Sequence, residues 1–166
     1  MSVLLDIALA MVIAGIVIVM LLNIQLGMTE SNIENRMTQS LQGLANATVD
    51  LIQEDIKRLV SFNELTDSTI KFVNTDNDVV TIERSGSSIR ILREFSDGSD
   101  PVERRENVYL QSLQFEAINL PNAANALLRI RVATEMNTED TQLDNTVRAF
   151  AQRDVLLRNL YFVQQD

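Results

Sequence analysis

The 166-residue sequence contains no cysteine and no histidine, and these two absences exclude several kinds of chemistry. Without cysteine the chain has no disulfide to stabilise a small fold and no thiol nucleophile. Without histidine it lacks the commonest general base, and together the two absences remove the usual ligands of zinc. Its five glycines form neither a GxGxxG motif nor a phosphate-binding loop. We therefore expect a protein that is not an enzyme, with no catalytic residue and no cofactor.

Basic residues are also scarce. The chain has 14 Lys and Arg against 23 Asp and Glu, which gives a formal net charge of −9. Contacts with phosphate groups need a concentrated basic face, so this balance argues against nucleic-acid binding as the main activity. We interpret the Arg104-Arg105 pair as part of a solvated surface. The first basic residue along the chain is Arg36, which leaves the N-terminal part without any Lys or Arg.

The N-terminal part is an apolar run over residues 3–22, VLLDIALAMVIAGIVIVMLL. About 20 apolar residues in a helix cover the roughly 30 Å hydrocarbon thickness of a bilayer. The run therefore predicts a membrane-spanning helix, and roughly 140 residues remain for one water-soluble domain. A cleavable secretory signal is the competing interpretation, but it requires a basic region at its start and a shorter apolar core. No basic residue precedes this run, so we favour the membrane helix.

A single carboxylate, Asp6, interrupts the apolar run. An Asp inside a spanning helix costs on the order of 3 kcal/mol unless it lies near the interface, is neutral or is paired. No side-chain cation is available nearby, so the candidate partner is an α-amino group, either of the same chain or of a neighbouring copy. The alternative is that Asp6 lies in the headgroup layer and contacts only water. Both explanations stay open.

The spacing of Asp6 and Gly15, nine positions apart, resembles the N-terminal helix of type IV pilins and type II secretion pseudopilins, the class III type. In that family an acidic residue, normally Glu, is fifth in the mature chain. Ser2 then matches the mature N-terminus and Met1 the last residue of the leader, so either the chain is already processed or no leader is used. The sequence departs from the family by having Asp in place of Glu, and Asn23 where the family has a helix-breaking proline.

This resemblance implies a structural subunit of an extracellular type IV pilus-like filament. Its partners would be copies of itself in a helical polymer and an inner-membrane assembly machinery. The subunit would lie in the inner or cytoplasmic membrane before assembly and in an extracellular or periplasmic filament afterwards. Major pilins, minor pilins and pseudopilins all fit. Small residues allow helices to approach closely, and the expected assembly residues are Asp6, Ser2, Ala8, Ala10, Ala14 and Gly15. The alternative function is a monomeric single-pass membrane protein with an extracytoplasmic binding or adaptor domain.

Beyond the apolar run, the helical period continues. Apolar residues in 28–60 recur at three- and four-residue spacing, and no proline interrupts them. We therefore expect one helix from near Ser2 to near Val60, with residues 41–59 packed on the C-terminal domain and residues 3–26 against other copies. A lone two-stranded coiled coil is the rival, but the heptads are not sustained.

From Asp67 onward, apolar and polar residues alternate, as in half-buried strands. The sequence predicts strands around Ile70/Phe72, Val80/Ile82 and Ile89/Ile91, a hairpin turn over 84–88, and further elements over 108–118, 127–133 and 147–163. A change of parity between Leu110 and Leu113 predicts a β-bulge. The expected fold class is α+β, with a long N-terminal helix and a small antiparallel sheet domain packed on its second half. The expected parts are an apolar helix over 1–27, its amphipathic continuation over 28–62 and a sheet domain over 63–166.

Two acidic loops, one at residues 74–78 and one at 97–100, are candidates for calcium binding, because oxygen-rich loops suit this ion. The possible ligands are Asp76, Asp78, Asp97 and Asp100. Neither loop has the spacing of an EF-hand, and clusters of Asn, Asp and Gly also form ordinary turns. A weak calcium site and a plain turn therefore remain alternatives.

Overall fold

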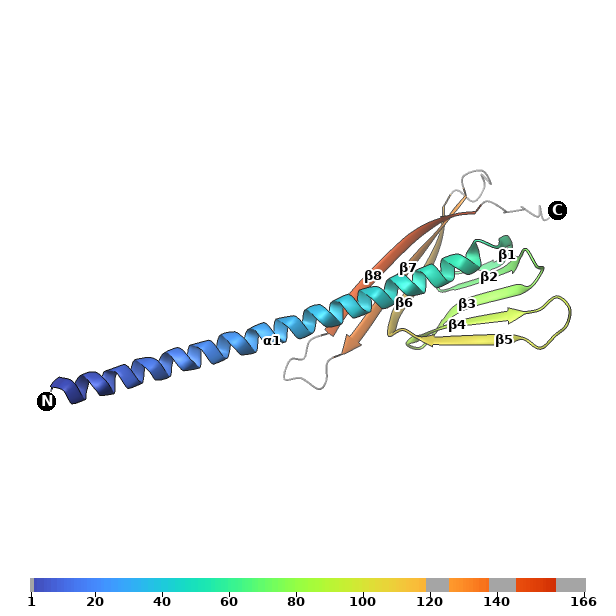
Figure 1. The fold of residues 1–166 in the computed structure, drawn as a ribbon. Helices are drawn as coiled ribbons and strands as arrows, with labels where there is room; N and C mark the ends of the chain where they lie inside the picture. The colour runs from blue at the N-terminus through green and yellow to red at the C-terminus, as the bar shows by residue number, and fades with distance from the viewer. Residues whose placement is uncertain (1, 119–125, 138–145, 158–166) are drawn as a thin grey trace. The chain divides into compact units, whose positions relative to one another are not determined.

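The computed structural model describes residues 2–118, 126–137 and 146–157, with side chains from Asp6 onward. Within these ranges the chain forms one helix and eight strands (Figure 1). Their bounds are α1 (Ser2–Ile56), β1 (Leu59–Leu65), β2 (Thr69–Asn74), β3 (Val79–Ser85), β4 (Ser88–Glu94), β5 (Val102–Asn107), β6 (Leu110–Ile118), β7 (Leu127–Asn137) and β8 (Thr146–Leu156).

The chain divides into two compact units, Met1–Met37 and Thr38–Asp166. Helix α1 contributes to both of them. The described part of the first unit is helix alone, and all of its side chains from Asp6 to Ile33 are exposed. The second unit contains the last turns of α1 and all eight strands. The chain is therefore an α+β protein, as the sequence predicts.

The strands form two antiparallel sheets instead of the single sheet that we expected. One sheet has the order β1-β2-β3-β4-β5, and the other has the order β6-β7-β8. The change of sheet follows β5, where Tyr109 adopts a positive φ of 51°. A non-glycine residue rarely adopts this conformation, so it marks a sharp local turn of the backbone. The single-sheet prediction is wrong because alternation locates strands but does not say which of them pair.

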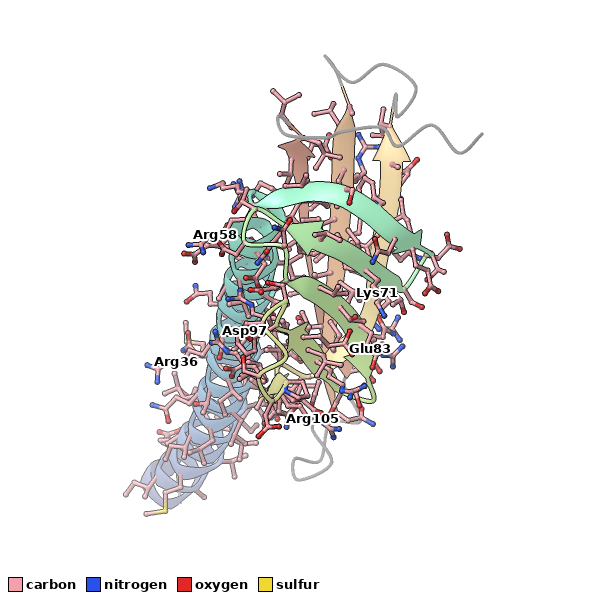
Figure 2. All side chains as sticks on the ribbon, turned by 90° about the vertical axis from the view of Figure 1, so that its right-hand side faces the viewer. Arg36, Arg58, Lys71, Glu83, Asp97 and Arg105 are labelled. Carbon is pink, nitrogen blue, oxygen red and sulfur yellow. The ribbon has the colours of Figure 1, made fainter. Side chains whose placement is uncertain are left out.

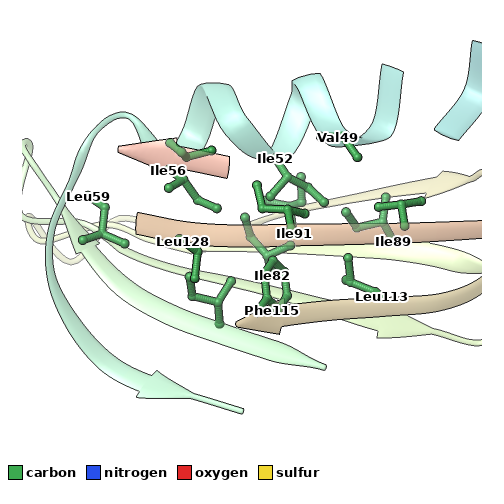
Figure 3. Close-up of a cluster of buried hydrophobic side chains, with 14 of the residues drawn as sticks. Val49, Ile52, Ile56, Leu59, Ile82, Ile89, Ile91, Leu113, Phe115 and Leu128 are labelled. Atoms are coloured by element: carbon green, nitrogen blue, oxygen red, sulfur yellow. The ribbon is translucent and has the colours of Figure 1, made fainter. Parts of the chain in front are cut away.

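The core lies between the C-terminal turns of α1 and the inner faces of both sheets. Ala45, Val49, Ile52 and Ile56 recur at three- and four-residue spacing on α1 and are all at most 1% exposed. They pack in one cluster with inward-facing strand residues such as Phe72. Figure 3 shows Ile52 and Ile56 of α1 close to strand residues of this cluster such as Ile82. Neighbours three and four residues apart share one face of a helix, so this stripe joins α1 to the sheets. The predicted packing of the second half of the helix on the sheet domain is confirmed.

Several local predictions are also confirmed. β2, β3 and β4 contain the three alternating pairs, and the turn between β3 and β4 lies at Gly86, whose φ is +63°. Glycine adopts this conformation without a steric penalty. The register of β6 against β7 shifts between Leu110 and Ser112, where the bulge was expected. β8 covers the first part of the element predicted over 147–163, and residues 158–163 lie outside the described residues.

The predicted end of the helix near Val60 is wrong, because α1 ends at Ile56. The Arg58 N–H donates to the Asp55 carbonyl at 3.2 Å, and Leu59 then begins β1 opposite Asn74. Leu59 is only 2% exposed, so it is a core residue although it belongs to a strand. Its spacing from Ile56 fits a helix and does not reveal that the backbone has already changed conformation.

Strand β5 was not expected at all. Its sequence, VERREN, contains one apolar residue and shows no hydrophobic alternation. It pairs with β4 at the edge of the five-stranded sheet, where Arg90 of β4 contacts Glu83 on one side and Glu103 of β5 on the other. An edge strand with exposed faces does not need apolar residues, so sequence patterns that report burial do not detect it.

The core predicts a large effect of truncation at Phe72, which is fully buried. Phe72→Ala should lower the free energy of unfolding by about 3–5 kcal/mol, because it removes buried apolar surface and leaves a cavity. The measurement is urea unfolding of the full chain in detergent, followed by circular dichroism. The control is Val73→Ala on the opposite, half-buried side of the same strand, for which we expect a much smaller loss. Equal losses in the two variants would contradict the assigned core face.

Candidate functional site

The N-terminal half of α1 is the most unusual surface of the described chain. Its side chains from Ile7 to Met28 are predominantly large and apolar, and those of this kind are between 48% and 70% exposed. α1 is long and apolar enough to cross a membrane, judged by length and composition. We call residues 6–28 the apolar segment. Within the described part of its unit, nothing but the helix itself is available to cover this surface.

The expected assembly residues lie on two opposite sides of the apolar segment. A helix turns by about 100° per residue, so Asp6, Ala10 and Ala14 share one side. By the same geometry Ala8 and Gly15 share the other side. All five are exposed. Ser2 is the first residue of α1, and its side chain lies outside the described side chains.

The small size of these residues is not required by the fold of the subunit. A Cβ atom added to Gly15 would meet nothing within 4 Å. Small side chains on a membrane helix allow another helix to approach its backbone closely. The apolar segment can therefore accept a neighbouring helix on either of two sides, between larger apolar residues that fill the space around the contact.

The apolar segment ends before Thr29, from where polar residues predominate. The Thr29 hydroxyl donates to the Gln25 carbonyl at 2.9 Å, so it is satisfied within the helix. Glu30, Ser31 and Asn32 follow and are exposed. This change of composition separates the apolar segment from the part of α1 that packs on the sheets.

The two acidic loops considered for calcium lie next to each other. Asp78 is 7% exposed, and one of its carboxylate oxygens accepts a hydrogen bond from the Ser96 N–H at 3.2 Å. The Asn74 side-chain oxygen accepts hydrogen bonds from the N–H groups of Asp76 and Asp78, at 2.8 and 2.9 Å. Asp78 thus connects the β2–β3 turn to the β4–β5 loop, which is a structural role for a buried carboxylate.

The other acidic residues of these loops have partners of their own or are exposed. Asp97 accepts hydrogen bonds from the Ser99 hydroxyl and from the Ser99 N–H, and these bonds lower the pKa of its carboxyl group. Asp76 lies 3.9 Å from the Arg58 guanidinium, and Asp100 is exposed. Across the described residues, no three or more His, Cys, Asp or Glu side chains are grouped so that they could hold a metal ion.

The outer faces of both sheets carry cross-strand ion pairs. On the three-stranded sheet, Arg129 of β7 contacts Asp154 at 2.8 Å and Glu116 at 3.6 Å. The hydrogen bond from Arg129 lowers the pKa of Asp154. Within β5 itself, Arg105 pairs with Glu103 and Arg104 pairs with Glu106, two residues along the same strand. Figure 2 shows Arg105, Glu83 and Lys71 as labelled side chains on the five-stranded sheet. These faces are therefore solvated surfaces with charges of both signs.

Comparison of the chain with protein-family models, with curated proteins and with solved structures finds no match.

The role of Asp78 gives a direct prediction. Asp78→Ala should lower the free energy of unfolding by about 1–3 kcal/mol, because the Ser96 N–H and the Asn74 amide lose a buried acceptor. Asp100→Ala, at an exposed position in the β4–β5 loop, should change it by less than about 0.5 kcal/mol. Both values can be measured by urea unfolding with calcium present or chelated. A loss for Asp78→Ala that is seen only with calcium present would contradict the structural role and favour a metal site.

Proposed function

We propose that this chain is a structural subunit of an extracellular type IV pilus-like filament, which assembles through the apolar segment of α1. The observation that carries the proposal is an exposed apolar surface over residues 6–28, with a carboxylate at its start and small residues on two opposite sides. The spacing of Asp6 and Gly15, which resembles that of pilins and pseudopilins, supports the same assignment.

The proposed assembly is driven by exchange of the surroundings of the apolar segment. In the membrane its surface is covered by lipid chains, which are as apolar as leucine. In a filament the same surface is covered by the equivalent segments of other copies. Because small residues lie on two opposite sides, each copy can contact one neighbour through one side and another neighbour through the other. A contact between different surfaces that does not close into a ring continues as a helical polymer.

Asp6 would make the assembled state more favourable than the lipid-covered state. In the bilayer its carboxylate is costly, by on the order of 3 kcal/mol at depth, unless it is paired. The first basic side chain of the sequence is Arg36, so the apolar segment supplies no partner. In the filament the amino terminus of a neighbouring copy would provide the cation. Pairing at this position would favour the assembled state over the lipid-solvated state and would fix the register between copies.

The alternative is an anchor that holds one copy of the sheet unit at a membrane. A pure anchor needs only apolar length. The carboxylate and the small residues on two sides would be unnecessary for it, and they are what the filament explains. The two functions predict different locations, because a filament subunit is released into the extracellular fraction by shearing, whereas an anchored protein stays with membranes.

The pairing role predicts the behaviour of Asp6→Ala. This variant should remain inserted in the membrane but should lose filaments from the sheared extracellular fraction, counted by negative-stain electron microscopy. Asp100→Ala is the matched control, because it removes an exposed carboxylate from a loop of the other unit. Normal filament numbers from Asp6→Ala would refute the pairing role. Wild-type chains found only as isolated molecules in membranes would refute the filament and leave the anchor.

The close-approach role predicts the behaviour of Gly15→Leu. The subunit has room for a side chain at this position, and replacing glycine inside a helix removes a cost of about 1 kcal/mol. We therefore expect normal membrane insertion and thermal unfolding, together with a loss of filaments of at least tenfold. The control is Ile16→Leu, which keeps the size of an exposed neighbour. If Gly15→Leu assembles as well as the control, close helix contact at Gly15 is excluded.

A further inference from the structure

A groove lies on the flank of α1 that faces strand β5. Its volume is about 250 Å³. We call it the α1–β5 groove; it is lined by Leu44, Ala47, Thr48 and Leu51 of α1, by Arg104 and Glu106 of β5, and by Val108. Its floor is mostly apolar. A cavity of about 150 Å³ with apolar walls is large enough to admit benzene, so the α1–β5 groove has room for one aromatic ring.

Strand β8 presents one aromatic ring to the solvent. Phe150 is 65% exposed, and it is the only described phenylalanine that belongs to the exposed class. Its partner across the sheet is Ala133 of β7, which in turn lies opposite Ser112 of β6. Both neighbours are small, whereas Arg148 and Gln152, two residues away on the same face of β8, are long and polar. Exposed rings with this setting are typical anchors of protein interfaces.

Phe150 and the α1–β5 groove lie on opposite flanks of α1. On one flank the Gln42 side chain donates to the Phe150 carbonyl at 2.8 Å. On the other flank Leu44 and Leu51 line the groove. At about 100° per residue, Gln42 lies roughly 160° to 180° around the helix from these two leucines. A copy therefore cannot place its own Phe150 in its own groove.

We infer that Phe150 of one copy occupies the α1–β5 groove of the next copy. This inference rests on the proposed filament function and names a second contact in the same polymer. Because the ring and the groove are different surfaces on opposite flanks, the contact is heterologous and propagates instead of closing a pair. The occupant is a second copy, because the ring and a groove large enough for it belong to the same chain.

Charge supports the same contact. Arg148 precedes Phe150 by two residues, so it lies on the same face of β8. Its side chain is 54% exposed although it pairs with Glu135 at 2.7 Å. Glu54 is exposed one turn beyond Leu51 on α1. A ring inserted in the groove would bring an arginine of one copy toward a glutamate of the next, which favours the correct orientation.

The contact can be tested by thiol cross-linking, because the chain has no cysteine of its own. The full-length double variant Ala47→Cys, Gln152→Cys keeps the Phe150 ring and places the second thiol two residues away, at an exposed position on the same face of β8. It is assembled and treated with a short bis-maleimide. We expect a ladder of covalent dimers, trimers and larger species, whereas each single variant gives none. The control pair is Ala47→Cys with Asn63→Cys, which places the second thiol at an exposed position of β1. This pair should give no ladder.

A second measurement tests the ring itself. Phe150→Ala should lower the filament yield about tenfold or more, as expected for the loss of an interface anchor. Leu156→Ala, at a 42% exposed leucine on the same face of β8, should lower it less than twofold. Reversal of charge in Arg148→Glu should also lower the yield, and adding Glu54→Arg in the same chain should restore part of it.

The outcomes separate this inference from the proposed function. Filaments that form without the cross-linked ladder would overturn the Phe150 contact and leave the filament intact. Covalent dimers from Gln152→Cys alone would overturn it too, because they require the Phe150 faces of two copies to meet each other. If the wild-type chain forms no filaments and gives only monomers, the proposed function fails, and the inference fails with it.

Discussion

The structure depends on one constraint, which is that the apolar segment is not covered by the described part of its own unit. Its side chains are exposed on every side of α1, including both sides that carry small residues. Apolar surface of this extent is unstable in water, so lipid or other protein has to cover it. By contrast, the later turns of the same helix bury a stripe of residues such as Ile52 against the two sheets. The C-terminal turns of α1 are therefore covered by the two sheets, whereas the N-terminal turns need lipid or another protein to cover them.

This division separates folding from assembly. The core of the sheet unit is built from α1 and both sheets, so it can form whatever covers the apolar segment. A helix with exposed apolar sides gains little from its own chain and can exchange one covering for another. Asp6 adds a charge to that exchange, because a carboxylate is tolerated poorly in lipid and better beside a cation. The proposed filament uses both properties. The sheet unit folds on its own core, and the apolar segment can exchange lipid for the helices of other copies.

Much of the fold could be predicted from the sequence, because a buried face places apolar residues at regular intervals along the chain. The alternation in β2, β3 and β4 and the three-and-four spacing on α1 report faces that are buried in the structure. Strand β5 has no such spacing of apolar residues, since its faces are mostly exposed and most of its residues are charged. The helix end at Ile56 was missed because Leu59 is buried in a strand at a spacing that also fits a helix. Asp6 and Gly15 could be singled out because they interrupt an apolar run, whereas the groove depends on segments distant in sequence.

The charges of β5 would have a consequence in the proposed filament, where many copies of the chain lie close together. β5 is the outermost strand of its sheet, and one side of its backbone has no neighbouring strand in that sheet. A free strand edge of this kind is a template on which a foreign strand can add, and crowding makes such addition faster. The order Glu-Arg-Arg-Glu in VERREN opposes it, because an identical strand paired in symmetric register, parallel or antiparallel, would bring like charges together. The charged residues of β5, which prevent its recognition as a strand from the sequence, would thus also protect closely packed subunits from amyloid-like stacking.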